Sequence, residues 1–180
     1  MKTKHRSLTG AALLLALSPW ITVSVRADEA EDKAVNAIQK MGGHITRDKK
    51  AKGSHIISVV LFGPNVTDAG LKHLAGLKHL QNLELYFTKV TDAGLKQVAG
   101  LNRLQTLNLD MTKVADAGLK HLAGLKQLRS LFLRSTKVTD AGLKHLAGLK
   151  QLQTLVLGNT KVTDKGKADL KKALPGLEIK

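Results

Sequence analysis

A valine recurs every 24 residues through most of the chain, at Val66, Val90, Val114, Val138 and Val162. The segment 66–78 returns unchanged as 138–150, and it returns as 114–126 with a single difference. Self-similarity at a fixed period of roughly 20–50 residues is typical of proteins built from stacked repeats, because one copy alone cannot bury its own apolar side chains. The chain is therefore expected to be a linear array of similar units.

Each copy carries four apolar residues at fixed offsets, which is the leucine-rich-repeat pattern. The copies hold Leu80, Leu83, Leu85 and Val90; Leu104, Leu107, Leu109 and Val114; Leu128, Leu131, Leu133 and Val138; Leu152, Leu155, Leu157 and Val162; and, in a divergent first copy, Ile56, Val59, Leu61 and Val66. Alternation such as Leu83-x-Leu85 points both side chains to one face of a strand, whereas the spacing of Leu71, Leu74 and Leu77 gives the apolar stripe of a helix. These patterns predict an α/β leucine-rich-repeat solenoid, with short parallel strands on the concave face and helices on the convex face.

Polar residues and glycines share the same period. We expect a helix N-cap at each recurring aspartate, that is, Asp68, Asp92, Asp116, Asp140 and Asp164. A left-handed helix C-cap is expected at each recurring glycine that follows the apolar stripe, that is, Gly76, Gly100, Gly124 and Gly148. Gly70 lies in the first helical turn and indicates close approach of a neighbouring copy. Structural hydroxyl bonds to the turn backbone are expected from Thr88, Thr112, Thr136 and Thr160.

The two ends of the chain depart from the repeat. Residues 1–27 combine a basic start, an apolar run and a Val-Arg-Ala motif, which is typical of a secretory signal peptide. Residues 8–25 carry no charge, so an uncleaved membrane anchor is the alternative. We expect a helical N-terminal cap over residues 28–55, repeats over residues 56–161 and a C-terminal capping repeat over residues 162–180. The protein is accordingly expected to be exported (periplasmic, cell-surface or secreted), with no membrane insertion after signal cleavage.

The repeat unit resembles a known group of proteins. Val-Thr-Asp-Ala-Gly-Leu at residues 66–71, followed by Leu-x-x-Leu-x-Leu-x-x-Thr-Lys at residues 80–89, resembles the cysteine-free leucine-rich-repeat proteins of planctomycete-type bacteria. The layout of helix and strand also resembles the ribonuclease-inhibitor-like superfamily. The resemblance covers about residues 33–180, and it implies the solenoid fold and a role in protein–protein binding.

Several functional classes find no support in the composition. The chain has no cysteine, which excludes a disulfide framework, a thiolate zinc site and a cysteine nucleophile. His73, His121 and His145 recur at one position, but packed helices lie about 8–10 Å apart, too far for these side chains to share a metal ion. No nucleophile–base pair or phosphate-binding loop is present. We therefore expect neither catalytic activity nor a cofactor.

The strand positions between the leucines differ from copy to copy, whereas the helical halves are nearly identical. All the aromatic residues after residue 27 lie among these variable positions, and exposed aromatic and arginine side chains are typical of binding hot spots. We therefore expect a protein-binding concave face formed by Phe62, Glu84, Tyr86, Phe87, Asp110, Met111, Phe132 and Arg134. Alternatively, Phe87 and Met111 fold over the strand ends and pack inward.

The positive charge offers a second hypothesis. The net charge of +15 becomes +11 when residues 1–27 are removed, with 25 Lys and Arg against 14 Asp and Glu. One row of lysines follows the strands, formed by Lys89, Lys113, Lys137 and Lys161. This row, together with the lysines of the convex face, could bind an anionic polymer of the cell envelope, or the row could simply be a solvated basic edge. The expected partner is thus a protein or an anionic polymer, and we expect a monomer.

Overall fold

A computed structural model describes residues 31–48 and 54–180, so the expected signal peptide lies outside the described residues. A helix over residues 31–40 comes first. The strands are β1 (His44–Arg47), β2 (Ile56–Val60), β3 (Asn82–Glu84), β4 (Thr106–Asn108), β5 (Ser130–Phe132), β6 (Thr154–Val156) and β7 (Glu178–Ile179). The helices are α2 (Asp68–Leu71), α3 (Asp92–Val98), α4 (Asp116–Leu119), α5 (Asp140–Leu143) and α6 (Asp164–Ala173), and α2, α4 and α5 continue into the 3₁₀ turns η1 (Lys72–Leu74), η2 (Lys120–Leu122) and η3 (Lys144–Leu146).

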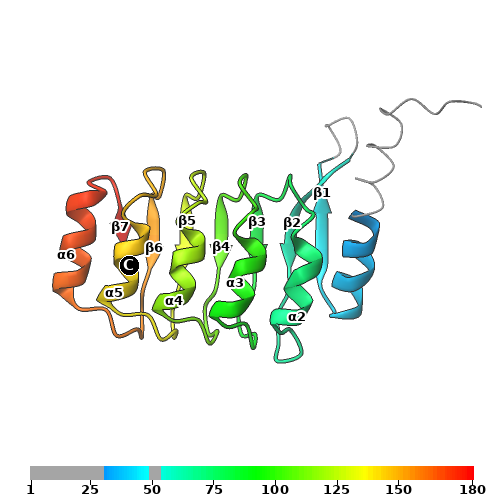
Figure 1. Ribbon diagram of the computed structural model, residues 1–180, viewed down its shortest axis with the longest axis horizontal. Helices are drawn as coiled ribbons and strands as arrows, with labels where there is room; N and C mark the ends of the chain where they lie inside the picture. The colour runs from blue at the N-terminus through cyan, green and yellow to red at the C-terminus, as the bar shows by residue number, and fades with distance from the viewer. Residues whose placement is uncertain (1–30, 49–53) are drawn as a thin grey trace, which may run out of the picture.

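The strands form one sheet in the order of the chain, with the helices in a row on one side of it (Figure 1). Strands β2 to β7 are parallel, and their register advances by one repeat per strand, as in the pairing of Leu83 with Leu107 and of Leu107 with Leu131. The predicted α/β leucine-rich-repeat solenoid is confirmed. Strand β1 was not predicted, and it pairs with β2 in the antiparallel sense.

The core is a continuous column of the repeating leucines and valines. Side chains from the strand and from the helix of each copy are fully buried, as Leu83, Leu95 and Leu107 illustrate. Thr88, Thr112 and Thr136 are also buried and Thr160 is partly buried, and the Oγ1 of Thr88 donates to the carbonyl of Leu85 at 2.8 Å. Equivalent bonds recur in the following copies. The structural role expected for these threonines is confirmed.

The aspartates do not cap their own helices, so the predicted N-caps are wrong. The N-cap is the preceding residue, for example Thr67 or Thr91, and each aspartate is the first helical residue. Asp68 instead reaches the next copy, where its Oδ1 accepts the backbone N–H of Thr91 at 2.8 Å and its Oδ2 accepts the Thr91 hydroxyl at 2.6 Å. We call this contact the Asp–Thr bridge. It recurs as Asp116–Thr139 and Asp140–Thr163, and as a backbone bond alone between Asp92 and Ala115.

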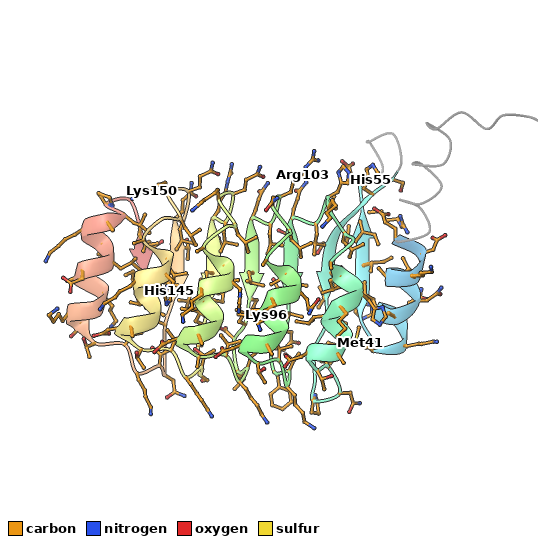
Figure 2. The ribbon with its side chains drawn as sticks, viewed as in Figure 1. Met41, His55, Lys96, Arg103, His145 and Lys150 are labelled. Atoms are coloured by element: carbon orange, nitrogen blue, oxygen red, sulfur yellow. The ribbon has the colours of Figure 1, made fainter. Side chains whose placement is uncertain are left out.

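The glycine in the first helical turn faces the Asp–Thr bridge, which confirms the close approach inferred for this position. A Cβ at Gly94 would overlap Oδ1 of Asp68, and Gly118, Gly142 and Gly166 face Asp92, Asp116 and Asp140 in the same way. Gly70 instead faces the sulfur of Met41, which follows the helix over residues 31–40 and lies beside α2 (Figure 2). The space that a side chain would need is therefore occupied by the preceding unit.

The predicted left-handed caps at Gly76, Gly100, Gly124 and Gly148 are wrong. Among the described residues, only Gly42 and Gly63 are glycines with positive φ. The helices end in tight turns of the right-handed kind, in which the N–H of Leu77 bonds the carbonyl of Leu74 at 2.9 Å. Lysines of the preceding copy help to satisfy the helix end, since Lys126 Nζ donates to the Gly148 carbonyl at 3.4 Å.

The helix over residues 31–40 closes the first end of the core. Ala34 and Ile38 are buried there, and Val35 and Met41 pack against the same cluster. Within the described ranges, no helix is long and apolar enough to cross a lipid bilayer.

Candidate binding face

On the concave face, equivalent residues of successive copies form rows that run across the strands. One row contains Glu84, Asn108 and Phe132, because these residues pair in register across β3, β4 and β5. The next row, two residues further along each chain segment, contains Phe62, Tyr86, Asp110 and Arg134. The third row follows immediately and contains Gly63, Phe87, Met111, Ser135 and Asn159. Parallel pairing thus stacks the eight predicted residues into three neighbouring rows at the carboxyl ends of the strands.

Large apolar side chains are exposed on this face. Phe62 is 48% exposed and Tyr86 is 41% exposed, and their rings stack with centroids 5.9 Å apart and planes inclined by 11°. Phe87 and Met111 are 56% and 57% exposed, so the alternative in which they pack inward is wrong. Phe132 is half-buried.

A hollow of about 410 Å³ lies at the centre of the face. Its walls are formed by Glu84, Tyr86, Asn108, Asp110, Met111, Arg134 and Ser135. The structure therefore brings five of the predicted residues around one hollow, and Phe62 extends it through its stacking on Tyr86. Phe87 and Phe132 do not line the hollow. Asn108 and Ser135 also lie among the variable positions expected to face the hollow, but the set of expected binding residues favoured aromatic and charged side chains.

The two carboxylates of the hollow differ in their surroundings. Asp110 accepts the backbone N–H of Arg134 at 2.7 Å, and its Oδ2 lies 3.7 Å from Arg134 Nε. Burial nevertheless raises the pKa of Asp110 above its usual value, against the opposing effect of Arg134. Glu84 is also half-buried, but its carboxylate has no hydrogen-bond or ion-pair partner among the described residues. Its carboxylate is therefore available to a ligand.

The third row has an unusual backbone conformation. Residues Gly63, Phe87, Met111, Ser135 and Asn159 all have positive φ, with 56° at both Phe87 and Met111. This left-handed region is rare for bulky residues, and it costs roughly 1–2 kcal/mol for an L-amino acid. The fold imposes it, because the N–H of Phe87 must bond the carbonyl of Asp110 in the next copy at 2.9 Å. Two large apolar side chains thus occupy positions that glycine or asparagine would fill with less strain.

The lysine row (Lys89, Lys113, Lys137 and Lys161) forms an edge just beyond the third row. Each backbone N–H bonds the preceding copy, as in the 2.9 Å bond from Lys89 to the Val66 carbonyl, so the spacing of the row is fixed. All four side chains are exposed. None of them forms an ion pair with another described residue. The aspartates nearest in sequence have other partners: Asp116 and Asp140 form Asp–Thr bridges, Asp92 accepts the N–H of Ala115, and Asp164 pairs with Lys167.

The opposite edge carries a cluster that was not predicted from the sequence. The rings of His55 and His79 stack with centroids 3.8 Å apart, and Arg103 Nη1 lies 2.9 Å from His79 Nδ1. Glu31 contacts both His55 and Arg47, at 3.3 Å and 3.0 Å. Burial, with help from His55 and Arg103, lowers the pKa of His79. His55, Arg103 and Lys150 mark this edge in Figure 2. The signal was available, because residues 55, 79 and 103 are one repeat apart.

The recurring histidines of the helices lie away from these sites, and His145 is seen on the helical side in Figure 2. In the described part of the chain, no group of three or more metal-ligating side chains could hold an ion.

The buried leucines, the register of the strands and the row of helices define the chain as a leucine-rich-repeat solenoid. No protein-family model matches the sequence, and no curated protein sequence matches it significantly. Among solved structures, the chain is similar to an internalin from Listeria monocytogenes, with 23% identity, a TM-score of 0.42 and coverage of 60% of this chain and 36% of that one. It is also similar to a leucine-rich-repeat protein of Leptospira interrogans, with 27% identity, a TM-score of 0.44 and coverage of 61% of this chain and 33% of that one. The chain thus spans about a third of the length of either protein.

Proposed function

We propose that the protein is a binding module that recognises another protein through its concave face, without catalytic activity. One observation carries this proposal. The exposed large hydrophobic side chains of the described residues are Phe62, Tyr86, Phe87 and Met111, and all four belong to the second and third rows at the carboxyl ends of neighbouring strands. Exposed apolar groups gathered on one surface are typical of interaction sites, and aromatic residues are enriched where binding energy is concentrated.

The strained backbone adds a second line of support. Phe87 and Met111 hold left-handed conformations that do not favour such side chains. Strain of this kind is concentrated at functional sites, where the side chain has a use that offsets its conformational cost. A scaffold residue at this position needs no bulk, as Gly63 and Asn159 demonstrate.

Capture from the envelope fraction of the source organism tests the proposal. The immobilised wild-type chain is compared with a Phe62→Ala/Tyr86→Ala variant and with Lys96→Ala, a control on the helical side. We expect specific proteins to be retained by the wild type and the control, at low and at high salt, and to be lost from the double variant. Retention of the same proteins by all three chains would refute a role for the concave face.

The lysine row supports a second candidate function, the binding of an anionic polymer. The supporting observation is that its four ammonium groups are exposed and free of ion pairs with described residues. Binding of this kind should weaken steeply with salt, by a slope of about −0.7 per neutralised phosphate on a log–log plot for a single-stranded polymer. Polyphosphate is a suitable probe.

The control for this second function is another row of equal charge. Replacing all four residues of the lysine row with glutamine should remove most polyphosphate binding. The same change at Lys72, Lys96, Lys120 and Lys144, on the helical side, should have a much smaller effect. Equal losses in the two variants would mean that net charge alone attracts the polymer.

We also propose that residues 1–27 direct export and are then removed. The support is the basic start, the apolar run and the Val-Arg-Ala motif of the sequence. Mass spectrometry of the protein from its native cells should find a chain that begins at Asp28. A chain that retains residues 1–27 would instead favour the membrane-anchor alternative.

A further inference from the structure

The carboxylate of Glu84 differs from the other carboxylate of the hollow, that of Asp110, in having no polar partner within the described ranges. It is half-buried in the wall of the central hollow, and it has no polar partner among the described residues. Asp110 lies in the same hollow but is already bonded to Arg134. A partly desolvated charge interacts more strongly with an opposite charge than an exposed one does, because less water screens it. Glu84 is thus the acidic group of this face best placed to receive a cation.

An aromatic surface lies directly beside this carboxylate. Tyr86 is two residues after Glu84, and both line the hollow. The stacking of Tyr86 on Phe62 is nearly parallel and leaves both rings substantially exposed. Cations are attracted to the faces of such rings, and a planar guanidinium can stack on a ring while its N–H groups bond a carboxylate.

We infer that the hollow binds one cationic side chain of the partner protein, and that arginine suits it better than lysine. Glu84 supplies the ion pair, Tyr86 supplies the aromatic face, and Met111 contacts the apolar part of the incoming side chain. This inference rests on the proposed function, because it assumes that a polypeptide occupies the concave face.

The charge of the rest of the molecule narrows the partner further. The lysine row borders the face, and the chain carries 29 basic against 14 acidic residues. This positive charge would repel a strongly basic partner. A segment with one arginine among apolar and acidic residues would instead complement both the hollow and the lysine row. The partner chemistry is therefore a single arginine in a neutral or acidic segment.

Selection from a random displayed-peptide library tests the inference on the full chain. Peptides that bind the wild type but not Tyr86→Ala are kept, since these occupy the concave face. Their arginine is then replaced by citrulline, which has the same shape without the charge. Affinities of both peptide forms are measured for the wild type, for Glu84→Gln and for Glu178→Gln, a control on β7 at the far end of the sheet.

We expect the selected peptides to contain arginine, and citrulline to weaken wild-type binding about tenfold, which corresponds to ~1.4 kcal/mol. Glu84→Gln should bind the citrulline peptide as well as the wild type does, which shows that it is folded, and it should show little preference for arginine. Glu178→Gln should keep the full preference. Tyr86-dependent peptides that lack a basic residue, or an equal arginine preference in Glu84→Gln, would overturn this inference and leave the proposed function standing. Failure to obtain any Tyr86-dependent peptide would count against both.

Discussion

Replacing Gly142 with alanine should destabilise the protein by about 2–5 kcal/mol. The new Cβ would overlap Oδ1 of Asp116 and lie 3.1 Å from its Cα. The Asp116 side chain would have to rotate away and lose its bonds to the backbone N–H and the hydroxyl of Thr139, at 2.8 and 2.7 Å. Hydrogen bonds to a charged group contribute roughly 1.5–3 kcal/mol each. Alanine in place of glycine in a helix gains about 0.5–1 kcal/mol, which offsets only a small part of that loss.

Urea denaturation followed by circular dichroism measures this difference directly. The matched control is Gly124→Ala, where a Cβ meets no atom within 4 Å and φ is not left-handed. We expect the control to be as stable as the wild type or more stable by up to about 1 kcal/mol, because alanine reduces the freedom of the unfolded chain. The slope of unfolding free energy against urea should be the same in all three proteins, so that the midpoints report stability alone.

The same Gly142→Ala change made in an Asp116→Ala variant tests whether the clash with the aspartate causes the loss of stability. In Asp116→Ala the carboxylate is absent, so the added cost of Gly142→Ala should fall to the residual contact with the Asp116 backbone. A Gly142→Ala variant as stable as the wild type would refute the assignment of this glycine to the Asp–Thr bridge. An equal cost of Gly142→Ala in both backgrounds would show that some other contact is responsible.

Three further changes have defined outcomes. Phe87→Asn introduces the residue found at the equivalent position Asn159. It should raise the unfolding free energy by about 0.5–1 kcal/mol in urea denaturation, because asparagine tolerates a positive φ better than phenylalanine does. A decrease would contradict the inferred strain at Phe87. Thr136→Val should lower it by about 1–2 kcal/mol because the buried hydroxyl bond to the Leu133 carbonyl is lost, and no change would mean that this bond has no net value. The lowered pKa of His79 means that the unfolded chain binds the proton more readily, so stability should fall as pH drops through about 6.5. His79→Gln should reduce this fall when denaturation midpoints at about pH 8 and about pH 5.5 are compared, and an unchanged fall would assign it to other groups.

The fold was predictable because burial follows the period of the sequence. Each leucine that repeats at 24 residues is buried, since stacking places equivalent side chains on top of one another. The close approach at Gly70 and its equivalents was predictable for the same reason, because a glycine in a helical turn has a cost that a packing constraint must justify.

The role of the aspartates was not predictable from local pattern. Threonine and aspartate are adjacent in each copy, as in Thr91-Asp92, and both are good N-caps. Their order favours the threonine as the cap, and the aspartate then meets a partner 23 residues later in the sequence. Only the stacking of whole copies reveals that partner.

The positive φ angles of the third row could have been predicted from the residue types found at this repeat position. Gly63 and Asn159 occupy the same repeat position as Phe87, and both types favour positive φ. Comparison down the repeat column would have predicted the conformation, whereas Phe87 considered alone suggests an ordinary strand end. The gathering of Tyr86 and Asp110 around one hollow depended on the register, which the period did supply.

The Asp–Thr bridge has a consequence for how such a chain can change in length. Removal of residues 114–137 would place Asp92 opposite Thr139, so the two new neighbours would already carry matching groups. The sheet can therefore grow or shrink by one strand at a time, and its strand residues can diversify, while the aspartate of each copy still bonds the backbone of the next copy.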